Sequence, residues 1–117
     1  MKIQVNTDSN IDGTEAVAEM AETVIGSALQ HFEDRLTRVE VHLSDVDAER
    51  GSGSDDKKCL LEARPEGMQP VVVTALAPTI EEACRGAATK MQSKLNSTFG
   101  RIDDRDASAT IRQAEAD

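Results

Sequence analysis

Two segments of the chain alternate between apolar and polar residues with a period of two. Residues 1–6 place Ile3 and Val5 between polar side chains, and residues 38–44 repeat the alternation with three aliphatic residues. Successive side chains of a strand point to opposite faces of a sheet, so the alternation indicates strands with one buried and one wet face. Both segments are therefore predicted strands.

The middle of the chain predicts a loop followed by a hairpin. Residues 45–56 have no apolar periodicity and contain a Gly-Ser-Gly-Ser run, which is typical of a flexible connection. Residues 58–64 and 70–76 are rich in strand-forming residues, and the turn-forming residues 65–69 separate them. These two runs are the predicted third and fourth strands.

A helical period marks the segment between the first two strands. We predict a helix over residues 15–33, with Thr14 just before the apolar run as a candidate cap. Its exposed face carries Glu15, Glu19 and Glu22, which suit the positive end of the helix dipole.

A second amphipathic helix follows the last predicted strand. Thr79 and Glu82 form a capping box, in which both side chains satisfy exposed amides at a helix start. The apolar stripe of this helix extends to Phe99, and Gly100 is well placed to end it.

The element order βαβββα predicts an α+β fold. Four strands with one apolar face and two amphipathic helices favour a two-layer sandwich, with the sheet in one layer and both helices packed on one of its faces. We expect one domain over residues 1–102. Residues 103–117 are acidic, have little to bury and predict a disordered tail.

Composition narrows the possible classes of function. The chain has 117 residues and only two aromatic side chains outside histidine, both Phe, which leaves little surface for stacking unpaired bases. No segment approaches the run of about 20 apolar residues that a membrane span needs, so we expect a cytoplasmic protein. Cys59 and Cys84 lie far apart in the sequence and are interpreted as small buried apolar residues.

The sequence contains no set of residues typical of an active site. His31 and His42 have no metal-ligand partner at a suitable spacing, and residues 51–54 lack the Lys-Ser/Thr ending of a phosphate-binding loop. Neighbouring carboxylates such as Glu81 and Glu82 are normally just solvated. We therefore expect a binding protein, not an enzyme, without catalytic residues, metal, cofactor or small-molecule substrate.

Charge is unevenly distributed along the chain. The net charge is −9, which by itself disfavours binding to phosphates. Residues 1–50 hold eleven acids and four bases, a net of −7, whereas residues 57–102 hold seven bases and four acids, a net of +3. A basic surface can therefore exist on one side of an acidic protein.

The basic residues of the second helix form a stripe. Lys90, Lys94 and Arg101 are separated by four and then seven positions, so they project within about 40° of one another. This stripe borders the apolar stripe and is predicted to face a groove between the helices. It is either a ridge that contacts phosphates or a solubilising surface that complements the helix dipole. Further candidates for the same surface are Arg85, Arg35, Arg38, Lys58 and Arg64.

Two pieces of sequence carry a family resemblance. Residues 31–36, His-Phe-Glu-Asp-Arg-Leu, lead into the strand Val-Glu-Val-His-Leu of residues 39–43. Residues 77–83, Ala-Pro-Thr-Ile-Glu-Glu-Ala, are followed by Thr-Lys-Met-Gln-Ser-Lys-Leu at residues 89–95. With the element order, these pieces resemble the ribosome hibernation-promoting factor and ribosome-associated inhibitor family, also described as sigma-factor modulation proteins. The resemblance covers about residues 1–101.

The resemblance implies a stress-response factor that binds the small ribosomal subunit and its rRNA near the decoding region and inhibits translation. It implies an rRNA-binding role for Lys90 above all. The chain departs from the family pattern where Ser93 and Lys94 stand in place of its usual Arg and Gln, and in the acidic first helix. The alternative is a protein-interaction or stress-adaptor module of the same fold that does not bind ribosomes and recognises a basic protein through Glu15, Glu19 and Glu22.

Overall fold

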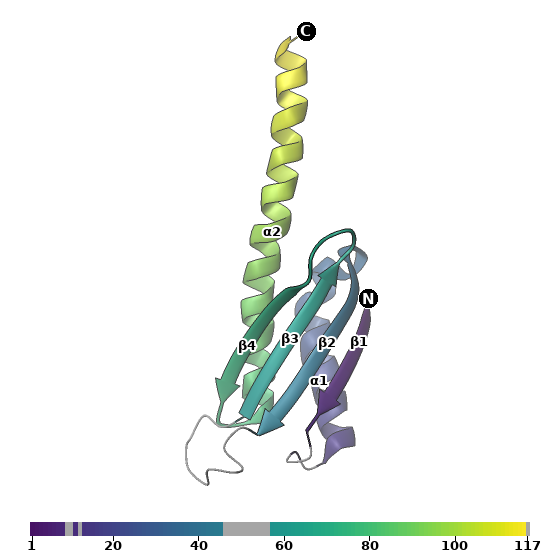
Figure 1. The fold of residues 1–117 in the computed structure, drawn as a ribbon, viewed down its shortest axis with the longest axis vertical. Helices are drawn as coiled ribbons and strands as arrows, with labels where there is room; N and C mark the ends of the chain where they lie inside the picture. Colours follow the sequence, from purple (N-terminus) through teal and green to yellow (C-terminus); the bar gives the residue numbers. More distant parts are fainter. Residues whose placement is uncertain (9–10, 12, 46–56, 117) are drawn as a thin grey trace.

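The computed structural model describes residues 1–8, 11, 13–45 and 57–116, with side chains through residue 101. Its four strands form one sheet in the order β1-β2-β3-β4, in which β1 is parallel to β2 and the other neighbours are antiparallel. This arrangement confirms the predicted α+β class (Figure 1). The elements in chain order are β1 (Lys2–Thr7), α1 (Thr14–Leu29), the 3-10 helix η1 (Gln30–Arg35), β2 (Leu36–Asp45), β3 (Lys57–Pro65), β4 (Val71–Ala77) and α2 (Ile80–Ala116).

Strand β2 lies inside the sheet and shows the predicted alternation. Val39, Val41 and Leu43 are buried, whereas the residues between them face the open side of the sheet. The strand extends one residue into the predicted loop, because Asp45 is the last residue of β2. Residues 46–56 of the predicted loop lie outside the described part of the chain.

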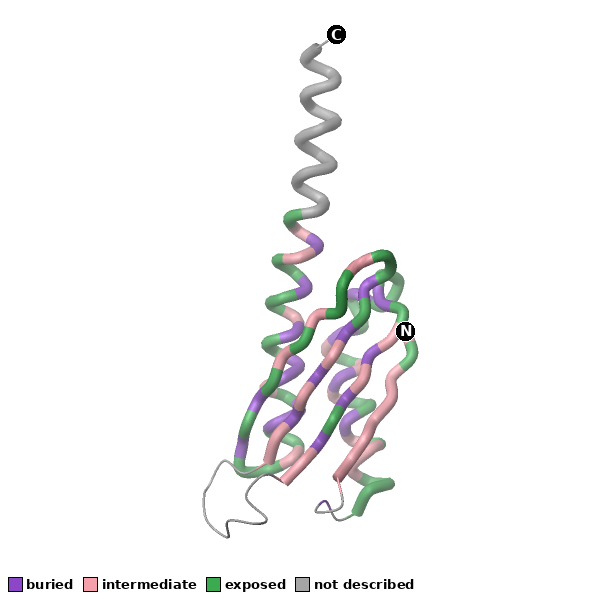
Figure 2. The backbone as a smooth tube through the Cα atoms, in the orientation of Figure 1, coloured by how far each residue is buried: buried purple, intermediate pink, exposed green. Residues whose placement is uncertain are grey.

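Both helices cover the same face of the sheet (Figures 1 and 2). The core between the layers contains Ile25 and Leu29 from α1, Leu61 from β3, and Met91 and Leu95 from α2, all fully buried. Burying one such side chain contributes roughly 1.5–3 kcal/mol. No helix of the described residues lies on the other face of the sheet, and the predicted two-layer arrangement is confirmed.

Helix α1 differs from its prediction at both ends. Its cap is Gly13, which has a left-handed φ of 65°, and Thr14 is the first residue of the helix and not its cap. The α-helix ends at Leu29, and the chain tightens into η1. This turn places Phe32 in the core, where its ring lies 5.7 Å from that of Phe99.

Helix α2 begins as predicted but continues past its predicted end. Thr79 Oγ1 accepts a hydrogen bond of 3.1 Å from the backbone N–H of Glu82, which forms one half of the capping box. The prediction that Gly100 ends the helix is wrong, because α2 continues to Ala116. Among the described glycines only Gly13 and Gly67 have a positive φ, so Gly100 does not adopt the conformation of a terminating glycine. The division into a domain over residues 1–102 and a tail stays a prediction.

Candidate nucleic-acid interface

The two lysines of α2 lie along the outer edge of the sheet. Lys90 Nζ donates a hydrogen bond of 2.7 Å to the backbone carbonyl of Thr74, and Lys94 Nζ donates one of 3.3 Å to that of Val72. Both carbonyls belong to β4, which is an edge strand. Both lysines are exposed, and with the exposed Arg101 further along α2 they form the surface that we call the basic ridge (Lys90, Lys94 and Arg101).

The basic ridge does not face a groove between the helices, so that prediction is wrong. A cavity of about 500 Å³ does lie between α1 and α2, but it is lined mainly by small and hydroxyl-bearing residues such as Thr23, Ser27 and Thr89. Of the predicted basic residues, Arg85 alone is among its lining residues, and its Nε lies 3.5 Å from a Glu81 carboxylate oxygen. The lysines instead point to the other side of α2, because that side is in contact with β4.

Arg35 lies apart from the ridge, at the end of η1. Its guanidinium lies 4.0 Å from the centroid of the Phe99 ring, and it lines a cavity with Asp34 and Glu66. A cation over an aromatic face in such an exposed place contributes about 0.5–1 kcal/mol. The contact gives Arg35 a structural role at the junction of η1 and α2.

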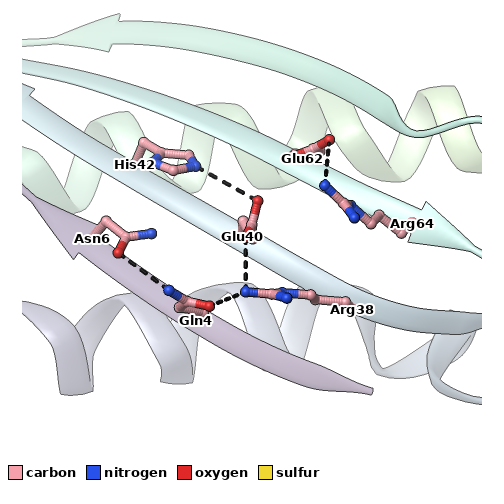
Figure 3. A network of polar contacts seen from close by, with 7 residues as sticks. All are labelled: Gln4, Asn6, Arg38, Glu40, His42, Glu62 and Arg64. Atoms are coloured by element: carbon pink, nitrogen blue, oxygen red, sulfur yellow. Dashed lines mark hydrogen bonds and ion pairs between the residues drawn. The ribbon is translucent and has the colours of Figure 1, made fainter.

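The open face of the sheet carries a second group of cations. The strand register places Lys2, Arg38 and Arg64 side by side on β1, β2 and β3, and we call these three residues the cation row. Glu40 and Glu62 stand opposite each other in the next row. An Arg38 Nη lies 2.9 Å from a Glu40 carboxylate oxygen, and an Arg64 Nη lies 3.6 Å from one of Glu62 (Figure 3).

Like charges that face each other across strands repel, and here the neighbouring row compensates for the repulsion. The cation row has three positive charges against two carboxylates, so its end of the open face keeps a positive excess. Arg38 also donates a hydrogen bond to the side chain of Gln4 on β1, which holds its guanidinium over the sheet (Figure 3).

Lys2 was missed in the sequence reasoning. It is distant in sequence from the other members of the row, and only the parallel pairing of β1 with β2 brings it beside Arg38. The signal available in the sequence was its position on the polar side of a predicted strand.

Lys58 lies on the same face but at the other end of the sheet. It is opposite Ser44 in the register and lines a cavity of about 280 Å³ with Asn6, Asp8 and His42. His42 Nε2 lies 3.9 Å from a carboxylate oxygen of Glu40. The structure therefore brings the predicted residues together as two surfaces, the basic ridge and the cation row, and leaves Arg35, Arg85 and Lys58 outside both.

Two buried thiols lie where β3 meets α2. Cys59 and Cys84 are free and fully buried, which confirms their interpretation as core residues. A hydrogen bond with the Cys84 thiol and burial raise the pKa of Cys59 above its usual range. Such a thiol stays protonated and unreactive.

Within the part of the chain that the structure describes, no three His, Cys, Asp or Glu side chains gather in a way that could hold a metal ion. The helices there include none that is long and apolar enough to cross a membrane.

Comparison with known proteins gives a family and a fold. A family model described as sigma 54 modulation protein / S30EA ribosomal protein matches residues 3–103. A ribosomal subunit interface protein from Coxiella burnetii has a similar structure, with a TM-score of 0.68 and 14% identity over 86% of this chain and 99% of that chain. The N-terminal domain of Thermus thermophilus Protein Y gives a TM-score of 0.65 and 16% identity over 84% and 99%. A search of curated proteins finds no match.

Proposed function

We propose a function from one established premise: the chain belongs to the sigma 54 modulation protein / S30EA ribosomal protein family. The protein is a cytoplasmic, ribosome-associated hibernation factor. It binds the small ribosomal subunit and its rRNA near the decoding region and inhibits translation under stress, without an enzymatic activity. The observation that carries this proposal is the family match over residues 3–103, which includes all but the first residue of the four-stranded sheet, the whole of α1, and α2 as far as residue 103.

The basic ridge supplies the main contacts to phosphates. An ammonium group has three N–H donors, and each lysine of the ridge uses one of them on a β4 carbonyl. The remaining donors of Lys90 and Lys94 face solvent, because both side chains are exposed. A phosphate group that binds here neutralises charge without reading base sequence.

The cation row supplies a second set of contacts on the opposite face of the sheet. Arg64 is about half exposed, and its long side chain extends from the open face (Figure 3). Guanidinium groups bind phosphates in a bidentate geometry, but here the carboxylates of Glu40 and Glu62 compete for Arg38 and Arg64. We therefore assign the row a smaller share of the binding energy than the ridge.

Co-sedimentation with ribosomes through a density gradient, at low and at moderate salt, tests the proposal. The wild-type chain is expected to travel with the small subunit at low salt and to dissociate as salt rises, because phosphate contacts release counterions. A Lys90→Glu, Lys94→Glu variant is expected to bind about tenfold more weakly or worse, since two attractive contacts become repulsive. Binding that neither salt nor this variant changes would contradict the role of the ridge, and absence of binding at both salt concentrations would contradict the function.

The acidic face of α1 supports a second candidate function, recognition of a basic protein partner. Glu15, Glu19 and Glu22 are all exposed on this helix. A Glu15→Gln, Glu19→Gln, Glu22→Gln variant serves as the matched control in the same gradients. It is expected to keep or strengthen ribosome binding, whereas loss of a protein partner together with unchanged sedimentation would favour the second candidate.

A further inference from the structure

The outer edge of β4 has backbone groups that no strand in the described part of the chain pairs. Because the lysines of the ridge reach the carbonyls of Val72 and Thr74, these two carbonyls point away from β3. In an antiparallel pair the N–H and C=O of one residue point to the same side. The N–H groups of Val72 and Thr74 therefore point outward, and the two-residue period adds that of Leu76. Such an edge is a template for an additional strand.

Aliphatic side chains lie directly beside this edge. Val72 is 43% exposed and Leu76 is 57% exposed, and they are the two exposed large apolar residues among the described side chains. Both stand on the open face of the sheet, with Thr74 between them and the half-buried Leu60 next to Thr74 on β3. An apolar strip thus follows β4 on the face away from the helices.

The ammonium groups of the ridge lie on the helix side of the same edge, and their spacing matches that of a strand. Lys90 and Lys94 are four residues apart on a helix, which is about 6 Å along its axis. Side chains on one face of a strand are two residues apart, which is about 6.6–6.8 Å. Two carboxylates at positions i and i+2 of an added strand would therefore each meet one ammonium group. The residue between them and the residues on either side of the pair would lie on the open face, along Val72, Thr74 and Leu76.

We propose that the β4 edge binds an extended peptide segment of a partner protein, with carboxylates alternating with aliphatic residues, as a fifth strand of the sheet. The backbone pairing supplies affinity. Lys90 and Lys94 select carboxylates on one face of the peptide, and the apolar strip selects aliphatic residues on its other face. In the free protein the ammonium groups cover the carbonyls of Val72 and Thr74, and they move to the carboxylates when the peptide binds. This binding mode shares Lys90 and Lys94 with the proposed phosphate contacts and differs from them in its need for backbone pairing.

A second copy of this chain fits the edge less well. Pairing two β4 edges would bring the Lys90 and Lys94 of one copy beside those of the other, and like charges repel. RNA offers phosphates for the lysines but has no N–H and C=O ladder for the strand. A peptide with alternating carboxylates and aliphatic residues matches the outward backbone groups, the two ammonium groups and the apolar strip of the edge.

The probe is the labelled peptide Thr-Val-Glu-Val-Glu-Val-Thr with blocked ends, and its control has Gln in place of both Glu. Fluorescence anisotropy is expected to show binding of the Glu peptide that is about fivefold tighter or more than that of the Gln peptide, in proportion to two exposed ion pairs. Amide hydrogen exchange is expected to slow at Val72, Thr74 and Leu76. Equal affinity for the two peptides, or no slowing at these amides, would overturn the proposal.

Variants separate strand pairing from charge. Thr74→Pro removes one outward N–H without touching the pairing with β3, and proline is tolerated at such edge positions. It is expected to weaken peptide binding about tenfold and to leave ribosome sedimentation unchanged, whereas Thr74→Val, which keeps the N–H, binds the peptide normally. Circular dichroism checks the fold of both proteins.

A second variant, Val72→Thr with Leu76→Thr, keeps strand propensity and removes the apolar strip. It is also expected to lose peptide affinity, so the test does not depend on how the proline variant folds. Full peptide affinity in a folded Thr74→Pro protein, or protection of the same three amides by a decauridylate RNA, would overturn the proposal.

Discussion

Thr79 shows how one side chain fixes where an element begins. Its hydroxyl accepts a hydrogen bond from the N–H of Glu82, and its carbonyl accepts another of 3.0 Å from the N–H of Ala83. The first N–H groups of a helix have no partner within the helix, so the hydroxyl satisfies a donor that would otherwise depend on water. The exposed position of Thr79 means that this role does not rest on packing.

Replacement of this cap gives a prediction for the residue scale. Thr79→Ala is expected to lower the free energy of unfolding by about 1 kcal/mol, because the N–H of Glu82 loses its acceptor. Denaturant unfolding measures the change, and Thr79→Ser, which keeps the hydroxyl, is the control and should stay close to wild type. An alanine variant as stable as the serine variant would contradict the role of the cap.

At the scale of elements, helix α2 performs two separate tasks along its length. One side buries Met91 and Leu95 against the sheet, and another places Lys90 and Lys94 along β4. The helix then continues past Phe99, the last core residue among the described side chains, as a single element that leaves the sheet (Figure 1). Gly100 lies at this transition and does not interrupt the helix.

A substitution at Gly100 therefore tests whether α2 continues or ends at this position. A Cβ at this position would meet no heavy atom within 4 Å, so Gly100→Ala is expected to stabilise the protein by up to about 1 kcal/mol and to increase the helical dichroism signal. If Gly100 were a left-handed terminating residue, alanine would instead destabilise it.

Gly67 supplies the matched contrast. It has a φ of 72° in the turn between β3 and β4, where alanine is strained although the space is open. Gly67→Ala is expected to cost about 1 kcal/mol, the opposite sign to Gly100→Ala. Thermal unfolding of the two variants beside wild type measures both changes.

At the scale of the whole molecule, the two layers meet at a pair of thiols. Cys59 comes from β3 and Cys84 from α2, and both are completely buried. Contact with Cys84 and burial raise the pKa of Cys59, so the folded state holds its proton at a pH where an unfolded thiol releases it.

The raised pKa predicts a loss of stability at alkaline pH. Below about 8.5, the usual pKa of an unfolded cysteine, both states hold the proton and the free energy of unfolding does not depend on this group. Above it, the unfolded state binds fewer protons than the folded state, so stability falls by up to about 1.4 kcal/mol per pH unit.

Urea unfolding between pH 7 and 10 measures this slope. A Cys59→Ala, Cys84→Ala variant is expected to be less stable at pH 7, because two buried groups are lost, but to show a shallower decrease as pH rises. Both thiols are replaced because burial would raise the pKa of Cys84 once its hydrogen bond with Cys59 is lost. A wild-type slope equal to that of the variant would contradict the assignment to this pair of thiols.

The family was accessible from sequence because two short motifs and the element order carry it. The site was accessible in part. Periodicity placed Lys90, Lys94 and Arg101 on one stripe of α2, and alternation placed Arg38 on the wet face of its strand, whereas Arg64 was only a further candidate for the basic surface. Neither pattern shows which other elements these residues lie against.

The sequence by itself determined which segments form strands and helices, though not where α1 and α2 end, because the type of an element depends on the spacing of apolar residues along a few turns or pairs. Tertiary structure alone decided that β4 is an edge, that the lysines of α2 lie along it and not between the helices, and that Lys2 joins Arg38 and Arg64. These facts depend on strand order and register between segments far apart in the chain. Local periodicity carries no information about such pairings, since it is the same for every order in which the strands could assemble.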